Sequence, residues 1–393
     1  MSRMKSKKIL FYADTVFGFG GVQRVLAVIA QALSDRNDIT ILSTDKAEDM
    51  SRYGYDKSNI QFKYISYNTK RDAEYYMCKC CSYIYKKYLP KTRITSRLYS
   101  HSFFLPKYKK KLIKNINSGG YDVVIGVHAF FSLHLASVKR KLNAPMVIGW
   151  MHNSFSALFD KENPYLPGLK SFFRWEMRNL NKIIVLSNSD KHLFETNLNL
   201  SSDVIYNPLT LNPRGKGGIE HHKFLSVGRF SPRHKGFDIL IEAFALFAKS
   251  NAEWTLEIVG EGDEESLYRQ IIANHGLEAR VAIKPFTTNI QKHYANASIY
   301  VLSSRWEGFG LVLVEAMAHG LPIIASDIPV ARELLCGKGV ADLFRSEDVA
   351  DLANKMHYIA EGKNYTSLSS NALEYSGRFS VKEISEKWEY AIS

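Results

Sequence analysis

Short apolar runs alternate with longer amphipathic stretches along the first half of the chain. The apolar run at residues 9–12 predicts a buried strand, and a glycine-rich turn leads from it into VQRVLAVIAQAL, which has the apolar spacing of a helix. Further strands are expected at four more short apolar runs, residues 39–42, 123–127, 146–150 and 183–186. Because helical patterns separate these runs, they predict a parallel sheet in a doubly wound α/β domain.

A loop rich in turn-forming residues separates this pattern from a second one of the same kind. Residues 207–218 read NPLTLNPRGKGG, which is typical of a linker between domains. Strands are expected after it at residues 223–227, 254–259, 281–284, 299–302 and 322–326. The helices expected in this part cover residues 238–249, 264–275, 310–319, 348–360 and 381–392. We therefore expect two α/β domains, residues 1–210 and 211–377.

Length and composition agree with a two-domain protein. The chain has 393 residues, 46% of them hydrophobic, which excludes a disordered polymer. Four cysteines, three of them at Cys78, Cys80 and Cys81, are too few for a disulfide framework and have the wrong spacing for a zinc site. The sequence lacks both a secretory leader and an apolar run of about 18–20 residues that could span a membrane. We therefore expect a cytoplasmic protein whose contact with a membrane is peripheral.

Positive charge is concentrated in residues 70–120. The chain has 52 Lys and Arg against 39 Asp and Glu, a net charge of +13, and this stretch contains thirteen basic residues, Lys70 among them, and two acidic ones. Nine Tyr and Phe side chains lie between the cations. This combination suits an anionic membrane surface, which we favour as a partner. A solvated basic face on a helical insertion is the alternative, and no nucleic-acid-binding module accompanies the charge.

Two glycine-containing segments follow predicted strands and could bind anions. Residues 18–23, GFGGVQ, lie where a strand leads into a helix, so free amide groups there favour a diphosphate. The spacing matches no dinucleotide or P-loop motif, and a purely structural turn stays open. In residues 226–238, SVGRFSPRHKGFD, Arg229 and Lys235 flank the carboxyl edge of the second predicted sheet. Two fixed cations could neutralise a diphosphate without a metal, although surface cations on a loop are the alternative.

The most specific motif lies in residues 303–320, SSRWEGFGLVLVEAMAHG. Glu307 follows a predicted strand, and Glu315 lies on the next helix with seven residues between the two, expected to face the same edge. Carboxylates bind pairs of sugar hydroxyls, because one group accepts two hydrogen bonds. Between them, the amides of residues 308–311 form a helix N-terminus that can hold phosphate or sugar oxygens.

Together these segments resemble a retaining glycosyltransferase of the GT-B fold, family 4, which has this pair of glutamates as its signature. The GGVQR loop, the VGRF and KG segment, EIVGEGDE at residues 257–264 and YNPL at residues 206–209 extend the resemblance over nearly the whole chain. It implies two Rossmann-like domains that face a cleft. The first domain would recognise the acceptor, and the second would bind a nucleotide-diphosphate sugar. It also implies that a final helix, residues 378–393, packs back on the first domain.

The resemblance assigns roles to individual residues. It implies that Glu307 contacts the donor sugar on its reacting face, that Glu315 binds the ribose and that Arg229 and Lys235 hold the diphosphate. His152, after a predicted strand, corresponds to a histidine near the sugar. Other donor contacts are expected from glycines of the first domain and from a serine and backbone amides of the second: Gly20, Gly21, Ser303, Phe309, Gly310 and Leu311.

The activity implied is that of a retaining hexosyltransferase. It would move a sugar from a nucleotide-diphosphate sugar, with UDP favoured, to a hydroxyl of a lipid-linked saccharide in bacterial capsule, exopolysaccharide or O-antigen synthesis, at the inner face of the cell membrane. We expect no metal cofactor, since no Asp-x-Asp pair ends a predicted strand. A front-face reaction is favoured, and a double displacement through a carboxylate stays open. The alternatives are a soluble or protein acceptor, another GT-B enzyme such as an epimerase, and an inactive nucleotide-sugar-binding protein.

Overall fold

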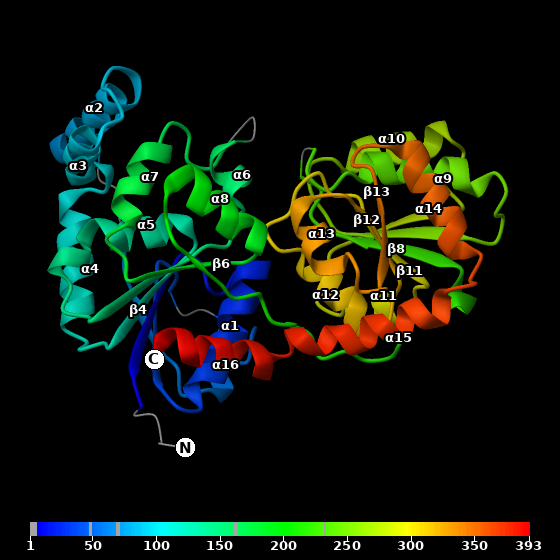
Figure 1. Cartoon of the computed structure of the whole chain (residues 1–393), viewed down its shortest axis with the longest axis horizontal. Helices are drawn as coiled ribbons and strands as arrows, with labels where there is room; N and C mark the ends of the chain where they lie inside the picture. Colours follow the sequence, from blue (N-terminus) through cyan, green and yellow to red (C-terminus); the bar gives the residue numbers. More distant parts are fainter. Residues whose placement is uncertain (1–5, 47–48, 68–70, 161–163, 232) are drawn as a thin grey trace. The chain divides into compact units, whose positions relative to one another are not determined.

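Two compact units make up the chain (Figure 1). The computed structural model describes residues 6–46, 49–67, 71–160, 164–231 and 233–393. The N-terminal unit comprises Met1–Pro208 and Val381–Ser393, and the C-terminal unit comprises Leu209–Ser380. Each unit contains one parallel sheet with helices packed against it, as the alternating pattern predicted.

The sheet of the N-terminal unit has seven strands in the order β3-β2-β1-β4-β5-β6-β7. The strands are β1 (Lys8–Ala13), β2 (Asp38–Ser43), β3 (Gln61–Tyr64), β4 (Val123–Val127), β5 (Met146–Trp150), β6 (Lys182–Val185) and β7 (Asp203–Val204). The five central strands are the apolar runs expected from the sequence, because a parallel sheet is covered on both faces. The edge strands β3 and β7 were not predicted, since β3 contains two polar residues in four and β7 has only two residues.

Nine α-helices of the described residues belong to the N-terminal unit. They are α1 (Gly21–Ser34), α2 (Ala73–Lys87), α3 (Arg93–Phe103), α4 (Pro106–Asn117), α5 (Ala129–Val138), α6 (Phe155–Phe159), α7 (Lys170–Met177), α8 (Asn188–Leu198) and α16 (Val381–Ile392), with short 3₁₀ turns at Tyr55–Lys57 and Lys139–Lys141. Helix α16 packs beside α1 and buries Trp388 against Trp150, with ring centroids 4.7 Å apart. The ammonium groups of Lys7 and Lys182 donate hydrogen bonds to carbonyl groups in its last turn.

The C-terminal unit has a six-stranded parallel sheet in the order β10-β9-β8-β11-β12-β13. Its strands are β8 (Lys223–Val227), β9 (Thr255–Val259), β10 (Val281–Lys284), β11 (Ile299–Leu302), β12 (Ile323–Ser326) and β13 (Ala341–Phe344). Its helices are α9 (Phe237–Ala248), α10 (Glu265–Asn274), α11 (Gln291–Ala295), α12 (Leu311–Ala318), α13 (Pro329–Leu335), α14 (Val349–Ala360) and α15 (Tyr365–Ser376), with 3₁₀ turns at Ile219–His221 and Gly377–Phe379. Only the edge strand β13 and the helices α11, α13 and α15 lack a counterpart in the sequence expectations.

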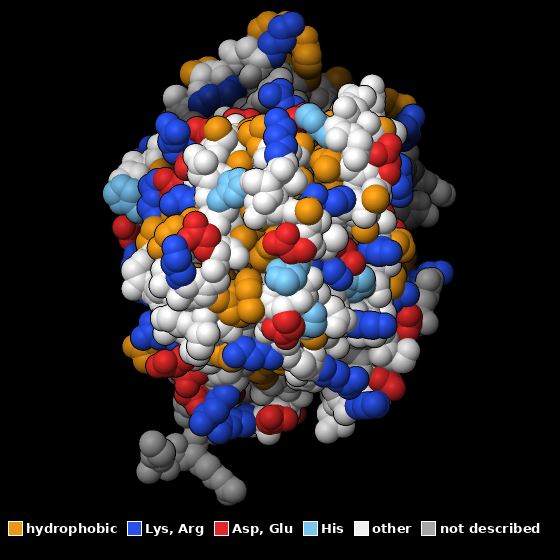
Figure 2. All heavy atoms as spheres, turned by 90° about the vertical axis from the view of Figure 1, so that its right-hand side faces the viewer, with side chains coloured by type: hydrophobic (Ala, Val, Ile, Leu, Met, Phe, Trp, Pro, Cys, Tyr) orange, Lys and Arg blue, Asp and Glu red, His pale blue; other side chains and the backbone are white. Residues whose placement is uncertain are grey.

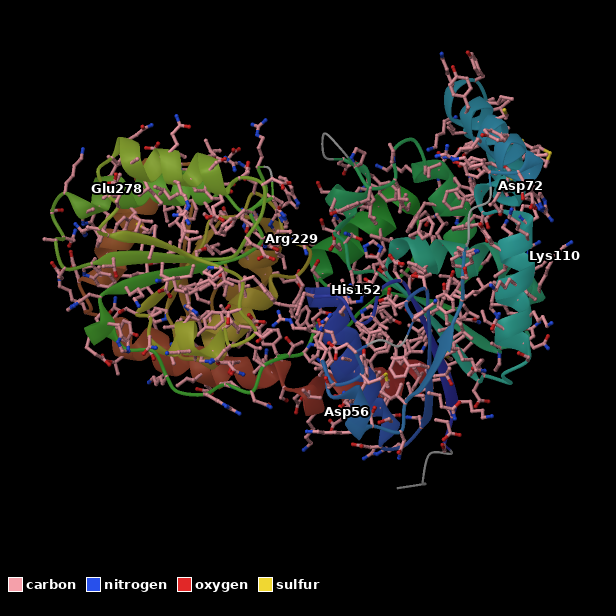
Figure 3. All side chains as sticks on the ribbon, turned by 180° about the vertical axis from the view of Figure 1, so that it is seen from behind. Asp56, Asp72, Lys110, His152, Arg229 and Glu278 are labelled. Atoms are coloured by element: carbon pink, nitrogen blue, oxygen red, sulfur yellow. The ribbon has the colours of Figure 1, made fainter. Side chains whose placement is uncertain are left out.

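Charge is distributed differently in the two units. Basic and acidic residues are nearly equal in number in the C-terminal unit, and Figure 2 shows them interspersed over the face of that unit turned to the viewer. In the N-terminal unit the excess of Lys and Arg lies on α2, α3 and α4, for example Lys110, which points outward from α4 in Figure 3. No helix within the described ranges is both long enough and apolar enough to cross a membrane.

Both sheets contain a point where the order of the strands reverses. In the N-terminal unit it lies between β1 and β4, and in the C-terminal unit between β8 and β11. The connections that leave these two strands go to opposite faces of the sheet, so a crevice opens beyond their carboxyl ends. Ligands of open α/β sheets bind at such points, which makes these two places the first to search for a site.

Candidate active site

The loop after β8 is fixed against the end of β11 by a glycine. Gly236 has a φ of +64°, and a Cβ atom there would lie 2.1 Å from the carbonyl oxygen of Ser303. Only glycine combines this backbone conformation with such a close approach. The hydroxyl of Ser303 donates a hydrogen bond of 2.8 Å to the carbonyl oxygen of Lys235. The two segments that the sequence singled out in this unit therefore meet at the switch point.

A buried ion pair occupies this meeting place. Lys235 Nζ lies 2.6 Å from Glu307 Oε1, and the two side chains are only 13% and 9% exposed. The hydroxyl of Ser304 donates a second hydrogen bond to the same carboxylate oxygen, at 2.7 Å. Two donors on one oxygen fix the orientation of the carboxylate and leave its other oxygen available for a ligand.

The surroundings keep Glu307 ionised. Burial raises the pKa of this carboxyl, but the charge of Lys235, the nearby His234 and the hydrogen bonds from Lys235 and Ser304 lower it by more, so that the pKa lies below its ordinary value. His234 is itself held by the ring of Trp306, which stacks on it with centroids 4.6 Å apart, and by a hydrogen bond from its Nε2 to the Trp306 carbonyl oxygen.

An exposed guanidinium lies at the same edge of the sheet. Arg229 follows β8 by two residues, and Figure 3 shows it at the rim of the C-terminal unit. Its side chain is exposed and forms no ion pair with any other residue that the structure describes. This cation and the partly buried Lys235 are both available to an anion that approaches the carboxyl ends of β8 and β11.

The helix that carries the second glutamate begins beside this pair. Gly310, with a φ of +76°, precedes α12, and Phe309 is buried against Phe379. The amides of Leu311 and Val312, the first two residues of α12, have no carbonyl group one turn earlier in the helix, as at any helix N-terminus, whereas the Leu313 amide donates to the carbonyl oxygen of Gly310. Residues 309–311, whose amides the sequence predicted to bind an anion, therefore lie at the N-terminus of this helix.

Glu315 lies one turn further along α12 and deeper in the unit. Its side chain is 2% exposed, and its Oε2 accepts a hydrogen bond of 2.9 Å from the hydroxyl of Tyr294. The ring of Tyr294 stacks on His319, which donates from Nδ1 to the carbonyl oxygen of Glu315. The carboxylate is thus oriented from α11 and α12, and its contact with a ribose remains a prediction.

The predicted contacts of the N-terminal unit lie at the ends of β1 and β5. Gly20 and Gly21 form the start of α1, in a loop that is held by a hydrogen bond from the Tyr53 hydroxyl to the Gly18 carbonyl oxygen. His152 follows β5 and packs against the ring of Trp150, with centroids 4.3 Å apart. Burial, aided by the neighbouring His128, lowers the pKa of His152 to about 3, so the ring is neutral at physiological pH.

A hollow of about 360 Å³ lies at the switch point of this unit. It is lined by the ends of β1 and β4 and by the first turns of α1 and α5: Ala13, Asp14, Thr15, Val22, Gln23, Leu26, Val127, His128, Phe130 and Phe131. Of these residues, the sequence singled out only Val22 and Gln23, as part of the loop at residues 18–23. Asp14 could have been found, because it lies two residues after a predicted strand.

His128 is held in an unusual backbone conformation at the rim of this hollow. Its φ is +82°, although it is not glycine, and its amide donates a 2.9 Å hydrogen bond to the carbonyl oxygen of Trp150. Burial lowers the pKa of His128, while the charge of Asp14 and a hydrogen bond with Asn153 act in the opposite direction. Residues in such strained backbone conformations cluster at functional sites.

Comparisons with known proteins agree with this arrangement. The sequence profile of Glycosyltransferase Family 4 matches residues 19–212, and that of Glycosyl transferases group 1 matches residues 214–375. An uncharacterized glycosyltransferase of Haemophilus influenzae is 27% identical over 388 residues, which cover 97% of this chain and 99% of that protein. The amylovoran biosynthesis glycosyltransferase AmsD of Erwinia amylovora is 24% identical over 359 residues, 86% of this chain and 84% of that protein.

The fold also matches solved structures. The crystal structure of Anabaena HepE in complex with UDP and glucose has a TM-score of 0.73 with this chain at 20% sequence identity, covering 98% of this chain and 99% of that one. The two parallel sheets and this likeness show the GT-B fold. The two profiles together cover most of the chain, which is a glycosyltransferase with a family 4 domain in its N-terminal half and a group 1 domain in its C-terminal half. The predicted fold, family and enzyme class are thereby confirmed.

Proposed function

We propose that this glycosyltransferase retains the configuration of a hexose that it moves from a nucleotide-diphosphate sugar to a hydroxyl of a lipid-linked saccharide. The observation that carries the proposal is the Lys235–Glu307 pair at the switch point of the C-terminal unit, with the exposed Arg229 beside it. The UDP and glucose in the HepE crystal structure support a UDP-sugar as the donor. The name of the relative AmsD supports a role in surface polysaccharide synthesis.

The charges at this site suit the departure of a diphosphate. Lys235 and Arg229 would hold the phosphate oxygens and stabilise the negative charge that develops on the leaving group. A phosphate that binds Lys235 competes with Glu307 for the ammonium group, so donor binding would loosen the ion pair and turn Glu307 toward the sugar. The ionised carboxylate would then stabilise the positive charge of an oxocarbenium-like sugar, while the leaving phosphate takes the proton of the incoming hydroxyl.

The remaining predicted donor contacts follow from where their residues lie. Glu315, oriented by Tyr294, would accept hydrogen bonds from the ribose hydroxyls, and the amides of residues 309–311 would bind the phosphates. Ser303 fixes the backbone of Lys235 and so would position the donor through that residue. His152, Gly20 and Gly21 would contribute from the N-terminal unit.

The hollow of the N-terminal unit suits an acceptor sugar. The ring of Phe130 is 44% exposed and offers an apolar face to the C–H groups of a pyranose. The Asp14 carboxylate lies in the same hollow and can accept hydrogen bonds from two neighbouring hydroxyls. We assign recognition of the acceptor saccharide to these two side chains.

A lipid-linked acceptor places the enzyme at a membrane. The basic residues of region 70–120 would attract the anionic inner face of the cell membrane, and the enzyme would work there as a peripheral cytoplasmic protein. Lys70, the first of these residues, lies outside the described residues. No metal is expected to take part: Arg229 and Lys235 supply the charge that a divalent ion would otherwise provide.

The test is release of nucleotide diphosphate from UDP-, GDP- and ADP-sugars in EDTA, with and without an extract of bacterial membrane lipids. We expect release from one donor that rises with the extract and falls at least a hundredfold in Glu307→Ala and Lys235→Ala. Exposed residues of the same unit provide matched controls, Glu278→Ala and Lys249→Ala, which should keep full activity. Loss of activity in EDTA would contradict a metal-free reaction. Equal activity with a short soluble acceptor and no response to lipid would favour a soluble acceptor.

A further inference from the structure

Large apolar side chains are exposed along one short part of the N-terminal unit. They lie on α2, on α3 and in the connection between them: Tyr76, Met77, Tyr83, Ile84, Tyr88, Leu89, Ile94 and Leu98. Three of them are among the most exposed apolar side chains of the described residues, Ile94 at 74%, Tyr88 at 64% and Leu98 at 63%. Single exposed apolar residues are common in proteins, but a continuous patch of them marks an interaction surface.

These side chains share one face of the α2–α3 hairpin, residues 73–103. On α2, the positions of Tyr76, Tyr83 and Ile84 fall on one side of a helix with 3.6 residues per turn, while the buried Cys78 and Tyr85 fall on the other. On α3, Ile94 and Leu98 are four residues apart and lie opposite the buried Ser96 and Tyr99. The hairpin therefore has an inner face packed on the unit and an outer apolar face that no described residue of the chain covers.

The hairpin is a well-packed element. The rings of Tyr85 and Tyr99 stack with centroids 4.2 Å apart, and Tyr99 packs on Phe172 of α7 at 4.9 Å. The side chains of Thr92 and Thr95 cap the start of α3. Figure 1 shows α2 and α3 standing out from the rest of the N-terminal unit. The exposed apolar face is thus held in place and does not result from a loosely folded segment.

Cations flank this apolar face on both helices. The hairpin carries six, namely Lys79, Lys86, Lys87, Lys91, Arg93 and Arg97, and its one acidic residue, Glu74, is at its base. A protein surface that bound this face would need an acidic apolar groove. An anionic bilayer supplies both parts at once, since its headgroups attract the cations and its acyl region accepts the apolar side chains.

We propose that the α2–α3 hairpin is a wedge that inserts Ile94, Leu98 and the neighbouring apolar side chains below the headgroups of an anionic bilayer. This rests on the membrane association proposed above and goes further, because it replaces attraction by charge alone with insertion. Electrostatic adsorption disappears when salt screens the charges, whereas burial of apolar surface does not. The two modes therefore differ in how binding depends on salt.

Sedimentation of the full chain with vesicles of phosphatidylcholine and phosphatidylglycerol tests the proposal. We expect wild type to retain a substantial fraction of its binding in 0.5 M salt, and Ile94→Ser with Leu98→Ser to lower the partition coefficient at least tenfold at low and high salt. Lys86→Gln with Lys87→Gln should weaken binding at low salt only. Leu246→Ser with Leu267→Ser, two exposed leucines of the C-terminal unit, is the matched control and should bind like wild type.

Two outcomes would overturn the wedge. One is binding of the Ile94→Ser, Leu98→Ser variant that equals wild type at every salt concentration. The other has two parts: wild type does not bind the vesicles, and it forms a dimer without lipid, detected by light scattering, that the same double variant does not form. The outer face would then bind a second copy of the chain. Circular dichroism and hydrolysis of the donor sugar without lipid establish that the variant is folded. If wild type inserts into vesicles but transfers no sugar, the proposed function fails and the wedge stands.

Discussion

At the scale of single residues, the buried pair of Lys235 and Glu307 is the feature on which most of the chemistry depends. A charge that is removed from water is stable only with a partner, so each residue of the pair requires the other. The sequence identified both residues, because strand ends and a family signature point to them. It did not predict that they would bind each other, since their separation in sequence says nothing about contact between two loops.

Removing one partner of this pair should cost more stability than removing both. We expect Lys235→Met to lower the free energy of unfolding by about 3 kcal/mol, because it leaves Glu307 as a buried unpaired charge. Adding Glu307→Gln should restore most of this loss without restoring sugar transfer. Urea unfolding of the two single variants and the double variant measures the effect, with Lys249→Met as the exposed control. Additive losses would show that the pair contributes nothing as a pair.

A neutral buried histidine should make stability depend on pH. Burial and the neighbouring His128 lower the pKa of His152 to about 3, against about 6.5 in an unfolded chain. As the pH falls from 6.5 toward 3, the unfolded chain takes up a proton that the folded chain does not, so the free energy of unfolding decreases over this range.

We therefore expect His152→Gln to flatten this slope by up to about 1.4 kcal/mol per pH unit, which corresponds to one proton. Above pH 6.5 the variant should show no change in slope. Unfolding in urea at several pH values measures this, and His192→Gln, a substitution at an exposed position, is the control. An unchanged slope in His152→Gln would mean that the ring titrates normally in the folded protein.

At the scale of elements, the sequence predicted the central strands of both sheets and the edge strand β10, but missed the edge strands β3, β7 and β13. The central strands of both sheets are rich in apolar residues, so their positions were found. The edge strand β3, QFKY, alternates polar and apolar residues over only four positions, which is too short for a periodic signal, and β13, ADLF, is equally short and contains a charged residue. Helices α2 and α3 appeared only as a basic stretch, because apolar residues occupy their outer as well as their inner faces.

The contact between the Lys235 loop and Ser303 can be tested at Gly236, with Gly276 as the control. Gly236 and Gly276 have nearly the same positive φ, +64° and +62°, but only Gly236 has another atom where a Cβ would lie. Gly276→Ala should cost about 1 kcal/mol from backbone strain. Gly236→Ala should cost at least about 2 kcal/mol more and lower kcat, because the loop must move away from Ser303. Equal costs in thermal unfolding would show that this contact does not fix the loop.

At the scale of the whole molecule, the two units share a fold but differ in surface chemistry. Each has its strand order reversed at one point, and polar side chains gather beyond the strand ends there. Basic and acidic side chains are interspersed on the face of the C-terminal unit shown in Figure 2, whereas the N-terminal unit carries the basic helices and the apolar hairpin. The nucleotide site is therefore predicted in the C-terminal unit, which has no excess of positive charge. Binding of an anion there would depend on two cations, Arg229 and Lys235, and little on the net charge of the unit.

Calorimetric titration of UDP into the full chain tests this account most directly. We predict binding in EDTA that weakens at least tenfold in both Arg229→Gln and Lys235→Met, while Arg345→Gln, at an exposed arginine of the same unit, binds like wild type. That result would place the diphosphate at the carboxyl ends of β8 and β11. Binding that is equal in all four proteins would contradict the account, because the diphosphate would then be held by other residues.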